Sequence, residues 1–242
     1  MLMGPQNSPQ LVRNLRNRID SAARAALRNV DSVTLLAVSK AQPADRVRAV
    51  AQLGLRDFGE SYVQEALDKI EALRDLPLTW HFIGRLQANK TRAVAASFDW
   101  VHAVDRLKIA ERLSEQRPFH ASPLNVCLQV NIGAEESKGG VSTAELPALV
   151  TAVTGLPRLK LRGLMCIPPD EDDPSRQRVW FANMRHALET LNAAGAQLDT
   201  LSMGMSGDFE SAILEGATIV RIGTALFGSR PNAAQAPLAP PQ

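Results

Sequence analysis

The sequence predicts an α/β fold, a single (β/α)8 barrel. Eight short apolar segments alternate with amphipathic segments over roughly 200 residues, which is the pattern of parallel strands joined by helices. The centres of the apolar segments are hydrophobic at successive positions, as in strands that are buried on both faces. The chain has 242 residues, of which 45% are hydrophobic, and this is enough for one sizeable core. A doubly wound open sheet is the alternative that the same pattern allows.

The first predicted strand is VTLLAVS, residues 33–39, which is polar only at its ends and is followed directly by Lys40. Seven further segments are predicted to be strands, at residues 56–60, 79–84, 99–105, 124–131, 159–167, 199–205 and 218–228. In a barrel the carboxyl ends of all strands meet at one mouth, where this fold places its chemistry.

Helices are predicted before the first strand and between the strands. Residues 10–29 carry leucine, isoleucine and alanine at helical spacing with arginines on the opposite face, which we interpret as solvated. Several of the later helical patterns end in a glycine, the residue that most readily adopts the left-handed conformation of a helix stop. These glycines are Gly54, Gly155, Gly195 and Gly216.

The two ends of the chain are expected to lie outside the barrel, which we place at residues 10–230. Residues 1–9 are polar with two prolines, and residues 231–242 are rich in proline and alanine, so both are expected to be disordered. The sequence opens without the basic and apolar regions of a signal peptide, and no apolar run is long enough to span a membrane. We therefore expect a cytoplasmic protein.

Charge and cysteine content argue against two other classes. The 27 basic and 25 acidic residues are interspersed and give a net charge of +2, so the chain lacks the basic stripe of a nucleic-acid-binding protein. Cys127 and Cys166 lie in separate apolar runs without CxxC spacing. They are expected to be buried free thiols in a reducing compartment, and no metal site is predicted.

Lys40 is the first candidate functional residue, because it stands at the carboxyl end of a buried strand. A pocket that partly excludes water lowers the pKa of a lysine from its ordinary value near 10.4, and a fall of about 3 units makes the amine a competent nucleophile. The alternative is a surface lysine whose ammonium group reaches solvent. On this segment alone both interpretations stay open.

The loops after the last two predicted strands suit an anion. Residues 202–206 are small or polar and run into a helix that is predicted to begin near Gly207, with Ser206 as its N-cap. At the other loop, Gly223 allows close backbone approach and Thr224 adds a hydroxyl group. Because the loops after strands seven and eight are the usual phosphate site of (β/α)8 barrels, a bound phosphate group is predicted there.

Arg221 precedes Gly223 by two residues, so both lie on the same face of the last strand. We expect the guanidinium to point into the barrel; an outward orientation would need a salt bridge to a helix carboxylate. Together, a lysine, a phosphate cradle and an inward arginine fit pyridoxal 5′-phosphate (PLP). This cofactor offers an aldehyde to the amine, a phosphate to the loops and a ring nitrogen to the guanidinium.

Six segments, AVSK, FGESYVQEA, WHFIGRLQANK, GLMCIP, SMGMSGDFESAI and VRIGTALFG, resemble the YggS/PROSC family of PLP homeostasis proteins. The resemblance spans about residues 10–230 and implies a barrel like the N-terminal domain of alanine racemase. It also implies a protein that buffers intracellular PLP and delivers it to apo PLP-dependent enzymes. By motif, Lys40 matches the Schiff-base lysine and Arg221 the arginine that faces the pyridine nitrogen. Ser206, Gly223 and Thr224 match the phosphate-binding positions.

Three further residues of these motifs and loops are candidate contacts. Ser61 is kept as a cofactor-binding candidate, although the family usually has asparagine there, which puts a side-chain amide contact in doubt. Met203 either packs near the cofactor ring or fills the barrel. Lys138, in the glycine-rich loop after the fifth strand, is a second amine that can compete for the aldehyde or pass it on; the alternative is a solvated loop.

The chemistry of such a site favours binding over turnover. An arginine is a donor without acceptor capacity, so it leaves the ring nitrogen unprotonated and weakens the electron sink. The alternative is an amino-acid racemase with a weak electron sink, which needs a second base. The single tyrosine, Tyr62, lies just after the second predicted strand at the start of a helix and is not expected to supply that base, and the four histidines are expected to be structural. A Schiff-base aldolase for a sugar phosphate is the third alternative, and a monomer is expected.

Overall fold

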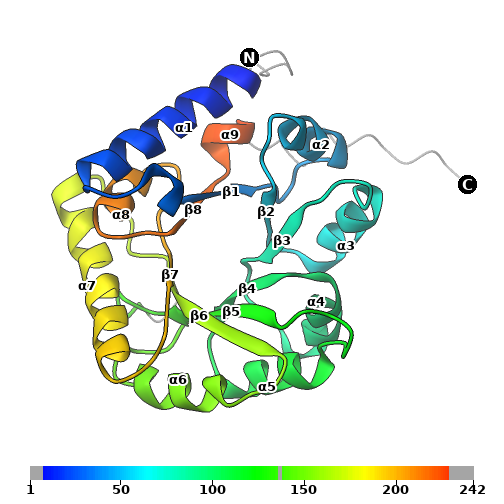
Figure 1. The fold of residues 1–242 in the computed structure, drawn as a ribbon, viewed down its shortest axis with the longest axis vertical. Coiled ribbons are helices and arrows are strands. Elements are labelled where there is room, and N and C mark those ends of the chain that lie inside the picture. The colour runs from blue at the N-terminus through cyan, green and yellow to red at the C-terminus, as the bar shows by residue number, and fades with distance from the viewer. Residues whose placement is uncertain (1–7, 136–137, 229–242) are drawn as a thin grey trace, which may run out of the picture.

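The computed structural model describes residues 8–135 and 138–228 of the chain (Figure 1). Eight parallel strands form a closed barrel in which each strand pairs with the next and β8 pairs with β1. This closure confirms the predicted (β/α)8 barrel and excludes the open doubly wound sheet. The strands are β1 (Thr34–Val38), β2 (Asp57–Glu60), β3 (Thr79–Phe82), β4 (Trp100–Val104), β5 (Leu124–Val130), β6 (Leu159–Cys166), β7 (Thr200–Ser202) and β8 (Ile219–Ile222).

The helices lie around the outside of the barrel (Figure 1). The α-helices contribute buried apolar residues to one continuous core that fills the layer between helices and sheet, whereas η2 and η3 have no buried residue. None of the helices among the described residues is long and apolar enough to cross a membrane. The helices are α1 (Ser8–Ala25), η2 (Val30–Ser32), α2 (Ala44–Gln52), α3 (Val63–Ala72), η3 (Ala88–Lys90), α4 (Thr91–Ser97), α5 (Leu107–Gln116), α6 (Leu146–Thr154), α7 (Pro174–Ala193), α8 (Phe209–Leu214) and α9 (Thr224–Phe227).

Helix α1 crosses the outside of the barrel beside α8 and α9 (Figure 1). Its Arg18 forms a salt bridge with Glu210 of α8 (2.6 Å) and lies over the ring of Phe209. The helix begins at Ser8, two residues earlier than expected, because Pro9 fits the first turn of a helix. The rest of the predicted disordered start, residues 1–7, and the predicted tail, residues 231–242, lie outside the described residues.

Two predicted strands are shorter than expected. Residues 218–228 were expected to form one strand, but β8 ends at Ile222 and residues 224–227 form α9. A short apolar run does not reveal by itself whether it is strand or helix. Likewise β7 ends at Ser202, because Gly204 adopts a φ of +93° and turns the chain away.

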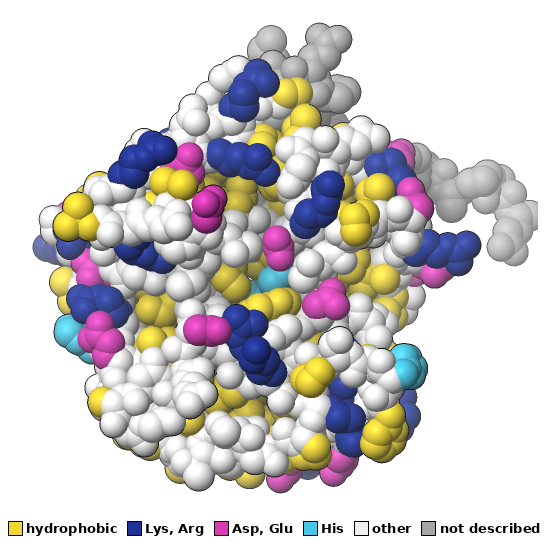
Figure 2. All heavy atoms as spheres, in the orientation of Figure 1, with side chains coloured by type: hydrophobic (Ala, Val, Ile, Leu, Met, Phe, Trp, Pro, Cys, Tyr) yellow, Lys and Arg dark blue, Asp and Glu magenta, His cyan; other side chains and the backbone are white. Residues whose placement is uncertain are grey.

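Three of the four predicted glycine helix stops are confirmed. Gly54, Gly195 and Gly216 have φ values of +89°, +101° and +98°, in the left-handed region. Gly155 has a φ of −77° and caps α6 in a right-handed conformation, so the prediction is wrong there. Figure 2 shows one face of the molecule, on which basic and acidic side chains are interspersed without a continuous basic stripe.

Candidate functional site

Lys40 lies at the barrel mouth next to the start of α9. It lines a small cavity of about 30 Å³ together with Val38, Gln42, Gly223, Thr224, Phe227 and Gly228. The closing pair of strands causes this proximity, because β1 runs beside β8 with Leu36 opposite Arg221. A Cβ atom at Gly223 would lie 3.4 Å from the carbonyl oxygen of Val38, which is van der Waals distance, so the two strand ends lie side by side. Barrel closure thus brings the amine and the predicted phosphate turn together.

The backbone on both sides of Lys40 is held by α3. Lys69, buried on that helix, donates a hydrogen bond to the carbonyl of Ser39 (2.7 Å). Glu65, also on α3, accepts one from the amide of Ala41 (2.6 Å) and forms an ion pair with Lys69 (2.6 Å). Ala41 has a φ of +60°, a left-handed conformation that a residue with a Cβ adopts only when its surroundings enforce it. The residue that carries the amine is therefore fixed between two anchored neighbours.

Glu60, at the end of β2, completes this network. Its Oε1 accepts hydrogen bonds from the Ser39 hydroxyl (2.6 Å) and from Lys69 (2.7 Å). Burial raises the pKa of the Glu60 carboxyl, and the hydrogen bonds from Lys69 and Ser39 oppose that effect. No described residue donates to the second oxygen, Oε2, which is also buried. A buried carboxylate and ammonium pair thus supports the Lys40 backbone from behind.

Arg221 extends from β8 into the barrel and is 5% exposed. Its Nη1 donates to the carbonyl and to the hydroxyl of Ser202 (2.6 and 2.9 Å), and its Nη2 donates to the carbonyl of Cys166 (2.8 Å). Burial lowers the pKa of the guanidinium. No described carboxylate forms a salt bridge with it, so an outward pairing with a helix is not what the structure shows. A buried cation held by neutral oxygens alone is costly, and an additional acceptor at the mouth would offset that cost.

The two cysteines are free and fully buried, as predicted. Burial raises the pKa of each thiol to about 12, and the nearby Arg221 lowers it by a smaller amount. Both thiols are therefore protonated at neutral pH and act as packing groups rather than nucleophiles.

Ser206 lies beside α9 rather than at the start of α8. Its Oγ accepts a hydrogen bond from the amide of Ala225 (3.4 Å), so it adjoins the turn that carries the Thr224 hydroxyl. The prediction that Ser206 caps a helix starting one residue later is wrong. Asp208 is the N-cap residue of α8, and its carboxylate accepts a hydrogen bond from the amide of Met205 (2.5 Å), which delays the helix. The turn after β7 and the turn after β8 nevertheless meet.

The other two candidates, Ser61 and Met203, do not line the cavity at Lys40. Ser61 follows β2 at the mouth, where its backbone packs against Gly84; a Cβ atom at Gly84 would lie 2.4 Å from the Ser61 carbonyl oxygen. The Ser61 side chain makes no hydrogen bond to a described residue. Met203 is fully buried within the main core, which favours the barrel-filling alternative, whereas Met205 is 39% exposed.

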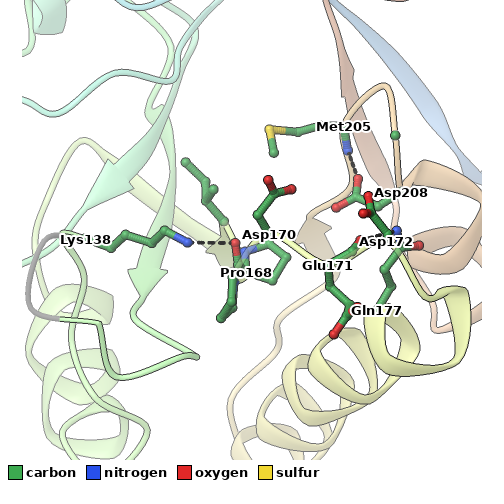
Figure 3. A pocket seen from close by; sticks show the side chains of 11 residues that line it. Lys138, Pro168, Asp170, Glu171, Asp172, Gln177, Met205 and Asp208 are labelled. Carbon is green, nitrogen blue, oxygen red and sulfur yellow. Dashed lines mark hydrogen bonds between the residues drawn. The ribbon is translucent and has the colours of Figure 1, made fainter.

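A second, larger cavity of about 340 Å³ lies between the loops that follow β5, β6 and β7 (Figure 3). Lys138 faces it from one side, with its amine donating to the carbonyl of Pro168 (2.9 Å) and paired with Glu135 (2.5 Å). Burial raises the pKa of Asp208 on the other side. The cavity extends to the turn after β7 through Met205 and Gly207. Its lining residues are Lys138, Ile167, Pro168, Pro169, Asp170, Glu171, Asp172, Gln177, Met205, Gly207 and Asp208.

The sequence alone does not predict the Glu60–Lys69–Glu65 network. Its members come from the end of β2 and from α3, and the sequence signal was the motif FGESYVQEALDK, in which acidic residues and a lysine recur at helical spacing. That spacing predicts the pair between Glu65 and Lys69 four residues apart. It does not predict that the lysine is buried against the preceding strand.

Comparison with known proteins places the chain in a family. Residues 12–231 match the family model for the alanine racemase N-terminal domain. The pyridoxal phosphate homeostasis protein of Pseudomonas aeruginosa is 59% identical over 90% of this chain and 94% of its own length. The protein of the same name from Escherichia coli K12 is 50% identical over 89% of this chain and 94% of its own length.

Solved structures agree with this placement. PipY of Synechococcus elongatus without PLP is 38% identical and superposes with a TM-score of 0.82 over 91% of this chain and 100% of its own. PipY with PLP bound is 39% identical, with a TM-score of 0.76 over 87% of this chain and 100% of its own. Alanine racemase of Corynebacterium glutamicum shares the fold at 19% identity, with a TM-score of 0.64 over 91% of this chain and 62% of its own. The chain belongs to the alanine racemase N-terminal domain family and, within it, to the pyridoxal phosphate homeostasis proteins.

Proposed function

We propose that the chain binds PLP at the barrel mouth and holds its aldehyde as a Schiff base on Lys40. The phosphate would be held by Ser206, Gly223 and Thr224, and the ring nitrogen would face Arg221. The observation that carries this proposal is the buried guanidinium of Arg221, which has no described carboxylate partner and lies near the mouth that also holds an amine and a glycine-containing turn. Ser61 and Met203 are retained as secondary contacts to be tested.

The protein residues themselves prepare the site for such a ligand. The α3 network fixes the backbone of Lys40, and the meeting of two turns presents the Ser206 and Thr224 hydroxyl groups together. When bound, PLP supplies an electrophilic aldehyde and an electron sink. Arg221 can donate to the ring nitrogen and cannot accept from it, so it leaves the sink weak. The residues therefore favour holding the cofactor over turning over a substrate.

The proposed role is homeostasis of PLP, in which the protein keeps the reactive aldehyde bound and releases it to apo PLP-dependent enzymes. Support comes from the relatives from two bacteria, which are named pyridoxal phosphate homeostasis proteins, and from the neighbour that was solved with PLP bound. We further propose a cytoplasmic monomer. The buried free thiols Cys127 and Cys166 fit a reducing compartment, and light scattering of the purified protein tests the oligomeric state.

The test first measures the visible absorption of the purified protein after incubation with PLP. The loaded protein is then mixed with an apo-enzyme, whose regained activity reports delivery of the cofactor. The wild-type protein should acquire a visible band that borohydride abolishes, and the apo-enzyme should regain activity. Lys40→Ala should show no such band. Lys160→Ala, which alters an exposed lysine at the start of β6, is the matched control and should behave like the wild type. A band of equal strength in Lys40→Ala, or a loaded protein that never activates the apo-enzyme, would refute the proposal.

The racemase alternative is separated by a second assay on the same protein. Exchange of the α-proton of free amino acids in deuterated water, over a broad panel, would reveal turnover. The site residues predict no exchange above the rate of free PLP, because Tyr62 is 60% exposed on the rim and both His81 and His102 are buried.

A further inference from the structure

A continuous chain of hydrogen bonds crosses the inside of the barrel and ends at Arg221. Asp57 on β2 contacts His81 on β3 (Oδ1 to Nε2, 3.1 Å), and His81 contacts His102 on β4 (Nδ1 to Nε2, 2.9 Å). The other ring nitrogen of His102, Nδ1, contacts the hydroxyl of Ser202 on β7 (2.7 Å), which in turn accepts from Arg221 (2.9 Å). Five side chains from five strands thus form one line.

All but one of these side chains are buried. His81 and His102 are 1% and 0% exposed, and Ser202 and Arg221 are 0% and 5% exposed. The Asp57 side chain is 31% exposed and links the line to solvent at the start of β2. Because buried polar atoms need partners, every contact along the line requires one donor and one acceptor.

When both imidazole rings are neutral, the two ends of the line fix which atom donates at every contact. Arg221 only donates, and a carboxylate at Asp57 only accepts, so Nε2 of His81 must carry a proton. In a neutral imidazole Nδ1 of His81 is then an acceptor, which requires that Nε2 of His102 carries a proton as well. By the same argument Nδ1 of His102 accepts, and the Ser202 hydroxyl donates to it.

The surroundings of His102 support a neutral ring. Burial, the neighbouring His81 and the charge of Arg221 together lower the pKa of His102 well below its ordinary value. His81 is buried as deeply and stacks on Trp100, with ring centroids 5.4 Å apart. With the His81 ring neutral as well, the donor order runs in one direction, from Arg221 to Asp57.

We propose that Asp57, His81, His102 and Ser202 are positioning residues that fix the orientation of the Arg221 guanidinium. With its hydrogen committed to His102, the Ser202 hydroxyl offers only its lone pairs to Arg221. The three contacts to Ser202 and Cys166 then occupy two Nη1 protons and one Nη2 proton, which leaves Nε–H and one Nη2–H for a ligand. The role toward the cofactor ring rests on the proposed function; the donor order does not.

The first test needs no cofactor. Long-range ¹H–¹⁵N NMR of the ligand-free protein near pH 7.5 reports the tautomer of each imidazole, and His120→Gln with His186→Gln removes the two histidines outside the line. Both remaining rings are expected in the Nε2–H form. An Nδ1–H tautomer or a cationic ring at either position would overturn the donor order, whether or not the protein binds PLP.

The second test measures PLP binding in two variants of one position. His102→Leu removes the acceptor for the Ser202 hydroxyl, whereas His102→Asn keeps an acceptor near the place of Nδ1. His102→Leu is expected to raise the dissociation constant for PLP about tenfold and to alter the pH dependence of the visible band, while His102→Asn stays near the wild type. The exposed His186→Leu is the control and should leave both readouts unchanged.

Circular dichroism and urea unfolding establish that each variant is folded before binding is measured. If a folded His102→Leu variant bound PLP as tightly as the wild type, with an unchanged pH profile, these side chains would only pack the barrel interior. The positioning role would then be refuted. Equal losses in the leucine and asparagine variants would refute it too, because the acceptor would then not matter. Failure of the wild type to bind PLP would instead refute the proposed function and leave the NMR result standing.

Discussion

Buried charged side chains lie next to the backbone of Lys40, the residue that is proposed to carry the cofactor. Glu60 and Lys69 are both almost wholly buried and lie 2.7 Å apart, with Lys69 also bonded to the carbonyl before Lys40. Such a pair contributes little net stability compared with an apolar pair of similar size, but loss of one partner leaves a buried charge uncompensated. Its value lies in fixing the backbone at residue 40.

Removal of the Lys69 ammonium should therefore be strongly destabilising. Lys69→Met retains the apolar stem and leaves Glu60 buried without its cation, which is expected to lower the free energy of unfolding by about 3–5 kcal/mol. Urea unfolding measures the change. The control is Arg74→Met, which breaks an exposed ion pair with Glu71 just beyond the same helix and should leave the urea midpoint unchanged. Equal effects of the two substitutions would contradict the assigned role of Lys69.

The buried His102 predicts how stability depends on pH. Its pKa is lowered in the folded protein, chiefly by burial, whereas the unfolded chain has the ordinary value of 6.5. Below pH 6.5 the unfolded state binds the extra proton, so this contribution is present above that pH and is lost as the pH falls. Between pH 7.5 and 5.5 the wild type should lose about 1.4 kcal/mol more stability than His102→Asn. Identical losses in urea unfolding would contradict the prediction.

At the scale of elements, apolar patterning predicts most of the barrel, and local turn chemistry explains where it fails. The strand at residues 33–39 is apolar at its centre and is buried on both faces in the structure, so its pattern is unambiguous. The segment TALF after Gly223 is equally apolar but forms α9. A run of four apolar residues fits a strand or a helix, so its pattern does not predict which of the two forms. Asp208 rather than Ser206 caps α8, a choice between two suitable residues that spacing alone does not decide.

The candidate site likewise contains residues that the sequence predicts and contacts that it does not predict. Strand ends indicate Lys40, Arg221 and the two turns, because each position follows from order along the chain and from the closed barrel. The line from Asp57 to Arg221 depends on the register of adjacent strands and, between His102 on β4 and Ser202 on β7, on which inward residues meet across the barrel. That register is a property of the three-dimensional barrel, and the histidines in the middle of β3 and β4 therefore looked like ordinary core residues.

Close packing of neighbouring strands gives a prediction at this scale. A Cβ atom at Gly163 on β6 would lie within clash distance of the Thr200 carbonyl oxygen on β7, so Gly163→Ala should force the two strands apart and cost about 1–3 kcal/mol. Gly155→Ala is the control, because its Cβ would meet only a carbonyl 3.8 Å away. Thermal unfolding compares them. A Gly163→Ala protein as stable as the control would show that the β6–β7 contact yields more readily than the structure indicates.

At the scale of the whole molecule, barrel closure joins the two ends of the described fold into one site. Lys40 follows β1 and Gly223 follows β8, so the cavity that they share exists only when these strands pair. A ligand that bridges them binds the folded state alone and must therefore stabilise the entire barrel against unfolding.

Addition of PLP should accordingly raise the stability of the wild type. At a free concentration 100 times the dissociation constant, the gain is expected to be about 2.7 kcal/mol, measured as a shift of the urea midpoint. Lys40→Ala should gain much less at the same concentration, because the covalent part of the attachment is gone. An equal shift in both proteins would indicate that PLP stabilises the fold without using Lys40.

The most direct test locates the attachment itself. The PLP-loaded protein is reduced with borohydride and digested, and mass spectrometry then identifies the lysine that carries the pyridoxyl group. The proposed site predicts the label on Lys40, with Lys138, beside the second cavity, labelled to a minor extent at most. A label found mainly on Lys138, or scattered over exposed lysines while Lys40 stays unmodified, would contradict the central claim.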